Sequence, residues 1–96
     1  MALHFEWDEN KANTSLKKHN VSFEEATTVF GDTWSITISD PLHSTNEDRF
    51  VIIGYSYKCR LLVVVHTERG DNIRINSARP TTKKERKFYE FYSTRK

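Results

Sequence analysis

The spacing of apolar residues in the first third of the chain predicts two short helices. An alternating segment at 3–7 is compatible with a short strand. Asp8 is suited to cap the first helix and Asn20 to end it, because Asn tolerates left-handed backbone. The segment 22–25 (Ser-Phe-Glu-Glu) has the spacing of a capping box, in which the Ser oxygen and the Glu carboxylate each bind a free backbone N–H. Apolar residues at helical spacing extend this second helix to about Gly31.

From residue 34 onward apolar and polar positions alternate, as is typical of strands. A polar loop at 40–48 and a turn at 68–72 separate runs rich in β-branched residues. The predicted strands are 36–38, 50–56, 61–67 and 73–78. A second capping box, Thr-Lys-Lys-Glu at 82–85, opens a C-terminal helix. Short connections favour an antiparallel meander, so the predicted fold is α+β, with two N-terminal helices, a four-stranded antiparallel sheet and a C-terminal helix.

Length and composition indicate one domain over residues 1–96. A chain of 96 residues is too short for two independent cores. Six Phe, four Tyr and two Trp supply large areas for burial. No apolar run approaches the roughly 18 residues needed to cross a bilayer, and the first residues lack a signal-peptide pattern. Cys59 is the only cysteine, which excludes an internal disulfide and a thiolate zinc cluster. We therefore expect a cytoplasmic protein.

The net charge of +2 conceals a strongly uneven distribution. Residues 1–48 carry three Lys against nine Asp or Glu, whereas residues 49–96 carry twelve Lys or Arg against four acidic residues, so the halves differ in sign, at −6 and +8. A basic half of this kind indicates nucleic acid or an acidic protein as partner; the alternative is a solvated surface with uneven charge. Seven of the twelve cations are Arg, whose forked donors suit phosphate or carboxylate.

Two long stretches resemble the BrnT family of bacterial toxins. Residues 61–90, LLVVVHTERGDNIRINSARPTTKKERKFYE, resemble the C-terminal core of that family. Residues 5–32, FEWDENKANTSLKKHNVSFEEATTVFGD, are similar to its Trp-Asp opening, its Lys-His helix end and its Ser-Phe-Glu-Glu-Ala second helix. The resemblance covers the chain from Phe5 to about Glu90, and its specificity lies in the order of the pieces.

The resemblance implies the toxin half of a type II toxin–antitoxin pair with a RelE-like fold. Such a protein would be an endoribonuclease that cleaves mRNA and inhibits translation without a cofactor. A BrnA-like antitoxin would neutralise it and carry the DNA-binding element, with two toxins on each antitoxin dimer. The competing interpretation is a non-catalytic module that binds a partner and acts through it in transcriptional autoregulation, because a fold alone does not determine function.

Metal-independent RNA cleavage needs groups that move protons and groups that stabilise the charged phosphorane. His66, at the end of an apolar strand, is a candidate acid or base; the alternative is a half-buried structural histidine. Glu68 would share its strand face and could orient or replace it, unless it is only a solvated turn carboxylate. The four His do not have metal-ligand spacing, so we expect no metal site.

Arg79 is the strongest candidate for holding phosphate. It lies between a predicted core strand and the N-terminus of the last helix, where free N–H groups also favour anions. The alternative is a salt bridge to Glu85 or to the acidic first half. The further candidates for RNA contacts are two Arg in or near the predicted turn at 68–72, the cations of the last helix and one aromatic residue able to stack on a base. They are Arg69, Arg74, Lys83, Lys84, Arg86, Lys87 and Tyr89.

Overall fold

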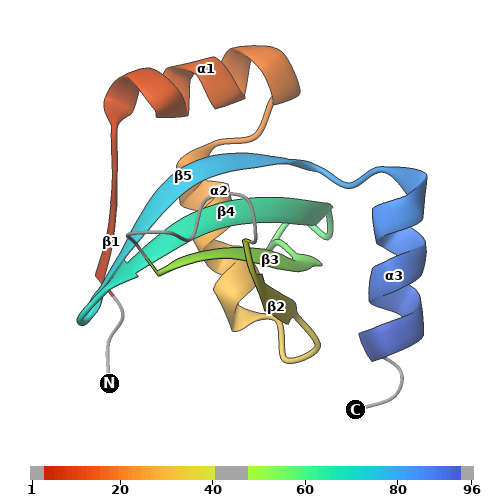
Figure 1. Cartoon of the computed structure of the whole chain (residues 1–96). Helices are drawn as coiled ribbons and strands as arrows, with labels where there is room; N and C mark the ends of the chain where they lie inside the picture. Colours follow the sequence, from red (N-terminus) through yellow and green to blue (C-terminus); the bar gives the residue numbers. More distant parts are fainter. Residues whose placement is uncertain (1–3, 41–47, 94–96) are drawn as a thin grey trace.

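One mixed sheet of five strands organises the protein, and the computed structural model describes residues 4–40 and 48–93 of it. In chain order the elements are β1 (His4–Trp7), α1 (Glu9–His19), α2 (Phe23–Thr28), the 3₁₀ turn η1 (Val29–Gly31), β2 (Ile36–Ser39), β3 (Arg49–Tyr55), β4 (Leu61–Arg69), β5 (Asn72–Pro80) and α3 (Lys83–Ser93). α1 runs alongside β5 at one side of the sheet. α3 follows the C-terminal end of β5, away from β1 (Figure 1). Among these helices none is long and apolar enough to span a membrane.

The predicted meander is confirmed for β2 to β5, which pair antiparallel in sequence order. The prediction of a purely antiparallel, four-stranded sheet is wrong, because β1 adds a fifth strand that pairs parallel with β5. Phe5 lies opposite Ile73 in this pairing, and Trp7 lies opposite Ile75. β1 has only four residues and pairs with residues almost 70 positions away, so no local sequence pattern predicts which strand lies beside it. Most of the predicted polar loop, residues 41–47, lies outside the described residues.

The two N-terminal helices form where their caps predict. The Asp8 side chain accepts from two N–H groups of the first turn of α1, and Asn20 ends the helix with a φ of 54°. Ser22 Oγ accepts from the N–H of Glu25, 3.0 Å away, which starts α2. The expected return bond of this capping box is replaced, because the Glu25 carboxylate instead accepts from Ser56 and Arg60. α2 ends at Thr28, and the 3₁₀ turn carries the chain on to Gly31.

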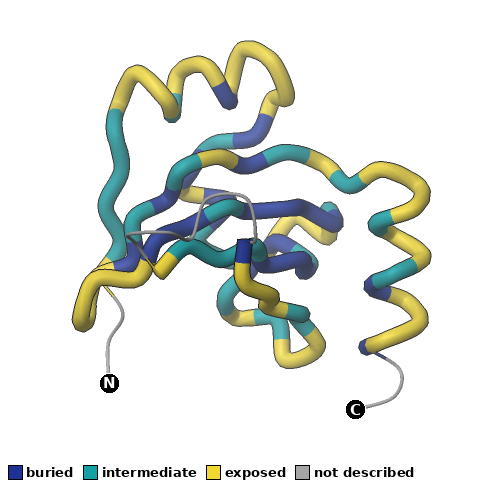
Figure 2. Tube along the Cα trace, in the orientation of Figure 1, coloured by how far each residue is buried: buried dark blue, intermediate teal, exposed yellow. Residues whose placement is uncertain are grey.

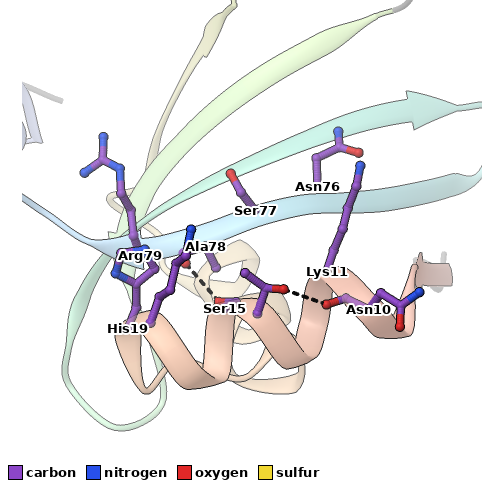
Figure 3. A pocket seen from close by; sticks show the side chains of 10 residues that line it. Asn10, Lys11, Ser15, His19, Asn76, Ser77, Ala78 and Arg79 are labelled. Atoms are coloured by element: carbon purple, nitrogen blue, oxygen red, sulfur yellow. Dashed lines mark hydrogen bonds between the residues drawn. The ribbon is translucent and has the colours of Figure 1, made fainter.

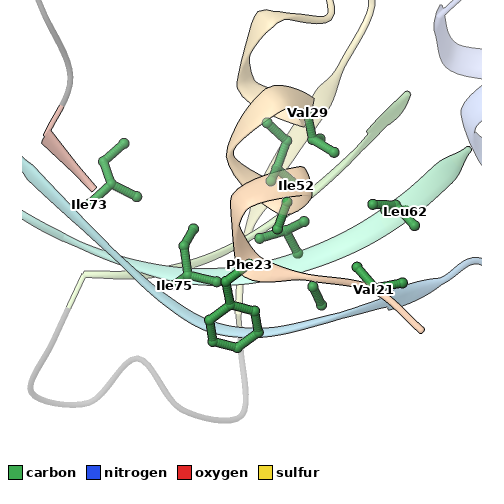
Figure 4. Packing of buried hydrophobic residues seen from close by; sticks show 10 residues of the cluster. Val21, Phe23, Val29, Ile52, Leu62, Ile73 and Ile75 are labelled. Carbon is green, nitrogen blue, oxygen red and sulfur yellow. The ribbon is translucent and has the colours of Figure 1, made fainter. Parts of the chain in front are cut away.

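Apolar side chains are buried on both faces of the sheet. Figure 2 shows that β4 is buried along most of its length, whereas α1 is mostly exposed. On one face α2 and the segment before it pack against the three central strands, with Phe23 and Val29 over Ile52, Leu62 and Ile75 (Figure 4). On the other face Tyr89 of α3 packs against a second cluster, which comprises Ile53, Leu61 and Val63. β4 contributes to both clusters and lies in the middle of the sheet, as its continuous apolar run predicts.

A buried ion pair joins α1, α2 and the turn between β3 and β4. The Glu25 side chain is 1% exposed and accepts from Ser56 Oγ at 2.7 Å and from Arg60 Nε at 2.9 Å. Arg60 Nη2 contacts the same carboxylate and also donates to the carbonyl of Asn20 at 2.8 Å. The hydrogen bond from Arg60 lowers the pKa of Glu25, although burial opposes this effect. The end of α1 is thereby tied to the body of the protein.

A second polar contact attaches α3. Asp32 Oδ2 accepts from the Tyr55 N–H at 2.9 Å and from the Tyr89 hydroxyl at 2.7 Å. Burial, together with this carboxylate, raises the pKa of Tyr89. Gly54 permits the close approach, since a Cβ at that position would lie 3.1 Å from Asp32 Oδ2 and 3.0 Å from Val29.

We predict that Glu25→Gln lowers the free energy of unfolding by about 3 kcal/mol, because it leaves Arg60 without its charge partner. Urea unfolding at pH 7 measures this change. Glu24→Gln is the matched control: Glu24 is exposed on the same helix, so its change should stay within about 0.5 kcal/mol. Equal effects of the two substitutions would contradict the prediction.

The same pair predicts a pH dependence. Since the folded pKa of Glu25 lies below its ordinary value of 4.5, its contribution is complete above that pH and is lost as the pH falls through the folded pKa. Stability should therefore decline less steeply below pH 4.5 in Glu25→Gln than in the wild type.

Candidate functional site

A groove of about 400 Å³ lies between α1 and the outer edge of β5 (Figure 3). β1 pairs only with residues 72–75 of β5, so the following residues of that edge have no strand beside them in the described part of the chain. α1 runs alongside this edge instead. The groove is lined by Asn10, Lys11, Thr14, Ser15, Lys18, His19, Asn76, Ser77, Ala78 and Arg79.

Ser15 anchors α1 at the base of the groove. Its hydroxyl lies 3.0 Å from the carbonyl of Ala78 on the β5 edge and 2.9 Å from the carbonyl of Val21. The hydroxyl has one proton, so the two carbonyls share it. This contact supplies the exposed edge of β5 with a donor that a neighbouring strand would otherwise provide.

The lining of the groove is cationic. Lys11, Lys18 and Arg79 contribute charge, His19 contributes an imidazole, and none of the ten lining residues is acidic. In Figure 3 the Lys11 side chain extends across the edge of β5 toward Asn76, while the His19 ring is directed from the end of α1 toward β5 at the level of Arg79. Donors at both ends of an acid-free groove suit an extended anion such as a phosphodiester backbone.

Arg79 is held at one end of the groove by a bidentate ion pair with Glu85. Nη1 and Nη2 lie 2.8 and 2.7 Å from the two carboxylate oxygens. The predicted capping box at the start of α3 is confirmed, since Glu85 also accepts from the Thr82 N–H at 2.8 Å and Thr82 Oγ1 accepts from the Glu85 N–H. The hydrogen bond from Arg79 is the main reason why the pKa of Glu85 falls to about 2.

This ion pair is the alternative interpretation of Arg79 that the sequence left open. It is compatible with a phosphate contact, because the Arg79 side chain stays 40% exposed and lines the groove. The Glu85 carboxylate occupies the position at the start of α3 where an anion was expected. The Arg79 side chain leaves β5 on the side away from α1 (Figure 3), so a phosphate would meet it at the rim of the groove and not over the helix N-terminus.

His66 and Glu68 lie on the opposite face of the sheet from Arg79. Arg79 pairs with Val63, on the α3 face, whereas His66 pairs with Phe50 on the α2 face. The His66 ring is 1% exposed and contacts Phe30 and Phe50, with centroids 4.8 and 5.7 Å away. Its Nε2 lies 3.4 Å from Glu68 Oε2, so this predicted pair does come together. Burial lowers the pKa of His66, and the Glu68 carboxylate partly opposes the shift.

The other predicted contact residues are dispersed. Arg74 forms an ion pair with Glu6 of β1, 3.0 Å apart, and Arg69 is exposed at the end of β4. The Tyr89 ring is buried against Tyr55, which leaves it no free face for stacking on a base. The four cations of α3 are exposed, and the Glu85 contact places the start of this helix beside Arg79. They are Lys83, Lys84, Arg86 and Lys87.

Sequence reasoning missed the contribution of α1 to this site. Lys11, Thr14, Ser15 and Lys18 recur at helical spacing and so share one stripe of the helix, a pattern present in the sequence. Which element this stripe faces depends on the pairing of β1 with β5, and local spacing does not encode that pairing.

The chain matches a known family over most of its length. The model of the BrnT family, described as the ribonuclease toxin of type II toxin–antitoxin systems, matches residues 7–85. Among solved structures, the chain is similar to the 1.1 Å crystal structure of the ribonuclease toxin BrnT from Brucella abortus. The TM-score is 0.65 at 20% identity, and the match covers 85% of this chain and 100% of that one, which shows a shared fold. No curated protein matches the chain.

We predict that the His66 imidazole titrates below its ordinary pKa of 6.5, because burial disfavours its charged form. Ring ¹⁵N chemical shifts measured against pH test this, with His66→Gln used to assign the signal. As the pH falls, His66 is protonated in the unfolded chain at a higher pH than in the folded protein. The free energy of unfolding should therefore decrease as the pH drops below 6.5 toward the folded pKa. A midpoint at or above 6.5 would contradict the prediction.

Proposed function

The chain belongs to the BrnT family of type II ribonuclease toxins, and on this basis we propose that it is a metal-independent endoribonuclease that cleaves mRNA and so inhibits translation. The observation that carries the proposal is the acid-free groove between α1 and β5. A single RNA strand would lie along it with its phosphates toward Lys11, Lys18 and Arg79. The expected RelE-like character of the fold and a cytoplasmic location belong to the same proposal.

Arg79 has the central role in this arrangement. Its guanidinium is oriented by Glu85 before any substrate binds, so it can stabilise developing phosphorane charge with little reorganisation. The cations of the first turns of α3 extend the positive surface beyond the Arg79 end. We assign Lys83, Lys84, Arg86 and Lys87 to contacts that do not depend on RNA sequence, with Arg69 and Arg74 as more distant ones.

The proposed partner is a BrnA-like antitoxin, because the family consists of type II toxins. DNA would be contacted only through this antitoxin, in an assembly of two toxins per antitoxin dimer. We propose that an acidic amphipathic helix of the antitoxin docks on the apolar surface formed by Trp34 and α3. Trp34 and Phe91 are 48% and 52% exposed, and a cavity of about 340 Å³ is lined by Trp34, Tyr89, Glu90 and Ser93. The exposed cations earlier in α3 favour acidic residues on that helix.

We predict that the purified protein cleaves single-stranded RNA in the presence of EDTA and that Arg79→Ala slows cleavage about 100-fold. Loss of the guanidinium removes the preorganised donor at the groove. Gel analysis of end-labelled RNA measures the rate, and urea unfolding verifies that the variant is folded. Lys17→Ala is the control, since Lys17 is an exposed cation of α1 that does not line the groove.

Intact RNA after incubation with folded wild-type protein would overturn the proposed activity and favour a non-catalytic, partner-binding module. Equal cleavage by Arg79→Ala would leave the activity standing and remove Arg79 from the site.

We predict that Trp34→Ala and Phe91→Ala each weaken binding of the cognate antitoxin about 10-fold or more, because each removes an exposed aromatic anchor. Titration calorimetry measures the affinity. The RNA cleavage rate should stay unchanged, because neither residue lines the groove. Tyr57→Ala is the matched control, an exposed aromatic residue in the turn between β3 and β4. Unchanged affinity in both variants would rule out this docking surface.

A further inference from the structure

We propose that His19 is the general base of RNA cleavage in the groove between α1 and β5. The proposal rests on the ribonuclease function proposed above and names the residue that removes the proton from the ribose 2′-OH. It moves the proton-transfer role from His66, which is enclosed on the other face of the sheet, to an imidazole in the same cavity as Arg79.

His19 is accessible from solvent and lies next to a backbone segment that is held in place. It is exposed, and it lines the groove together with Lys18 and Arg79. Among the other histidines in the described residues, His66 is buried and His4 on β1 does not line the groove. An accessible imidazole beside phosphate-binding cations is the combination that a proton transfer at a phosphodiester needs.

The backbone around His19 is held from two sides. Asn20 ends the helix in the left-handed conformation, with its N–H bonded to the carbonyl of Leu16. The Asn20 carbonyl accepts from Arg60, which in turn is paired with the buried Glu25. The end of the helix that carries His19 is therefore tied to the body of the protein, which favours a defined position for a base there.

The chemistry balances with the groups present and with water. The neutral imidazole of His19 takes the 2′-OH proton, and the 2′-oxygen forms a bond to phosphorus. Lys18 and Arg79 stabilise the charge of the phosphorane. The bond from phosphorus to the 5′-oxygen then breaks, and that oxygen takes a proton from water while the imidazolium returns its proton to the resulting hydroxide. The products are a 2′,3′-cyclic phosphate and a free 5′-hydroxyl, with no net proton uptake.

The charged groups that line the cavity with His19 are all cationic. They are Lys11 and Lys18 of α1 and Arg79 of β5. Because the active form of the base is the neutral imidazole, a catalytic role for His19 predicts that the cleavage rate increases with pH.

The test compares wild type, His19→Ala and the control His4→Gln on an end-labelled, single-stranded RNA of mixed sequence. A fully 2′-O-methylated copy of that RNA, which lacks the nucleophile, reports binding alone. We expect His19→Ala to slow cleavage about 100-fold while its affinity for the methylated RNA changes about threefold at most. Added imidazole should restore part of the rate, and the rise with pH should disappear from the unassisted variant. His4→Gln should behave as wild type.

The outcomes separate this proposal from the one on which it rests. No cleavage by folded wild-type protein would overturn the ribonuclease function, and the role of His19 with it. Cleavage by His19→Ala near the wild-type rate would overturn only the role of His19. A slow variant that imidazole does not rescue and that keeps the wild-type pH profile would also overturn it, because His19 would then act in structure or binding.

Discussion

The outer edge of β5 is the constraint on which the arrangement of the site depends. β1 has four residues and pairs with less than half of β5, so the edge beyond Ile75 needs other partners for its backbone groups. α1 meets this need through Ser15, whose hydroxyl reaches the Ala78 carbonyl. A helix is wider than a strand and bonds an edge at single points, so its packing leaves a groove where a sixth strand would leave none.

The buried Glu25 carboxylate keeps this geometry in place. Burial of a carboxylate is costly unless hydrogen bonds satisfy it, and here Ser56 and Arg60 do so. The ion pair also connects α1 and α2 to the turn between β3 and β4, because Arg60 donates to the Asn20 carbonyl at the end of α1. The position of α1, which forms one side of the groove, thus depends on Glu25, which does not line the groove.

The two faces of the sheet have separate roles. Side chains alternate along β4, so His66 and Val63 point to opposite faces because they are three residues apart. The α2 face is closed over His66 by Phe30 and Phe50. On the other face α3 is fixed by Tyr89 and Asp32, and the start of α3 meets Arg79 through Glu85. The Arg79 side chain therefore lies on the α3 face, where it stays 40% exposed.

Local sequence determined the elements and their order. The caps at Asp8 and Ser22, the capping box at 82–85 and the apolar run of β4 predict helices and strands that the structure contains, because each depends on residues within a few positions of one another. It also made Arg79 a candidate, with Glu85 as its alternative partner. Only the tertiary structure decided that β1 joins β5, that α1 faces its free edge, and that His19 and not His66 shares a cavity with Arg79. These relations join residues about 60 to 70 positions apart, and they follow from long-range pairing and strand-face geometry, which local periodicity does not record.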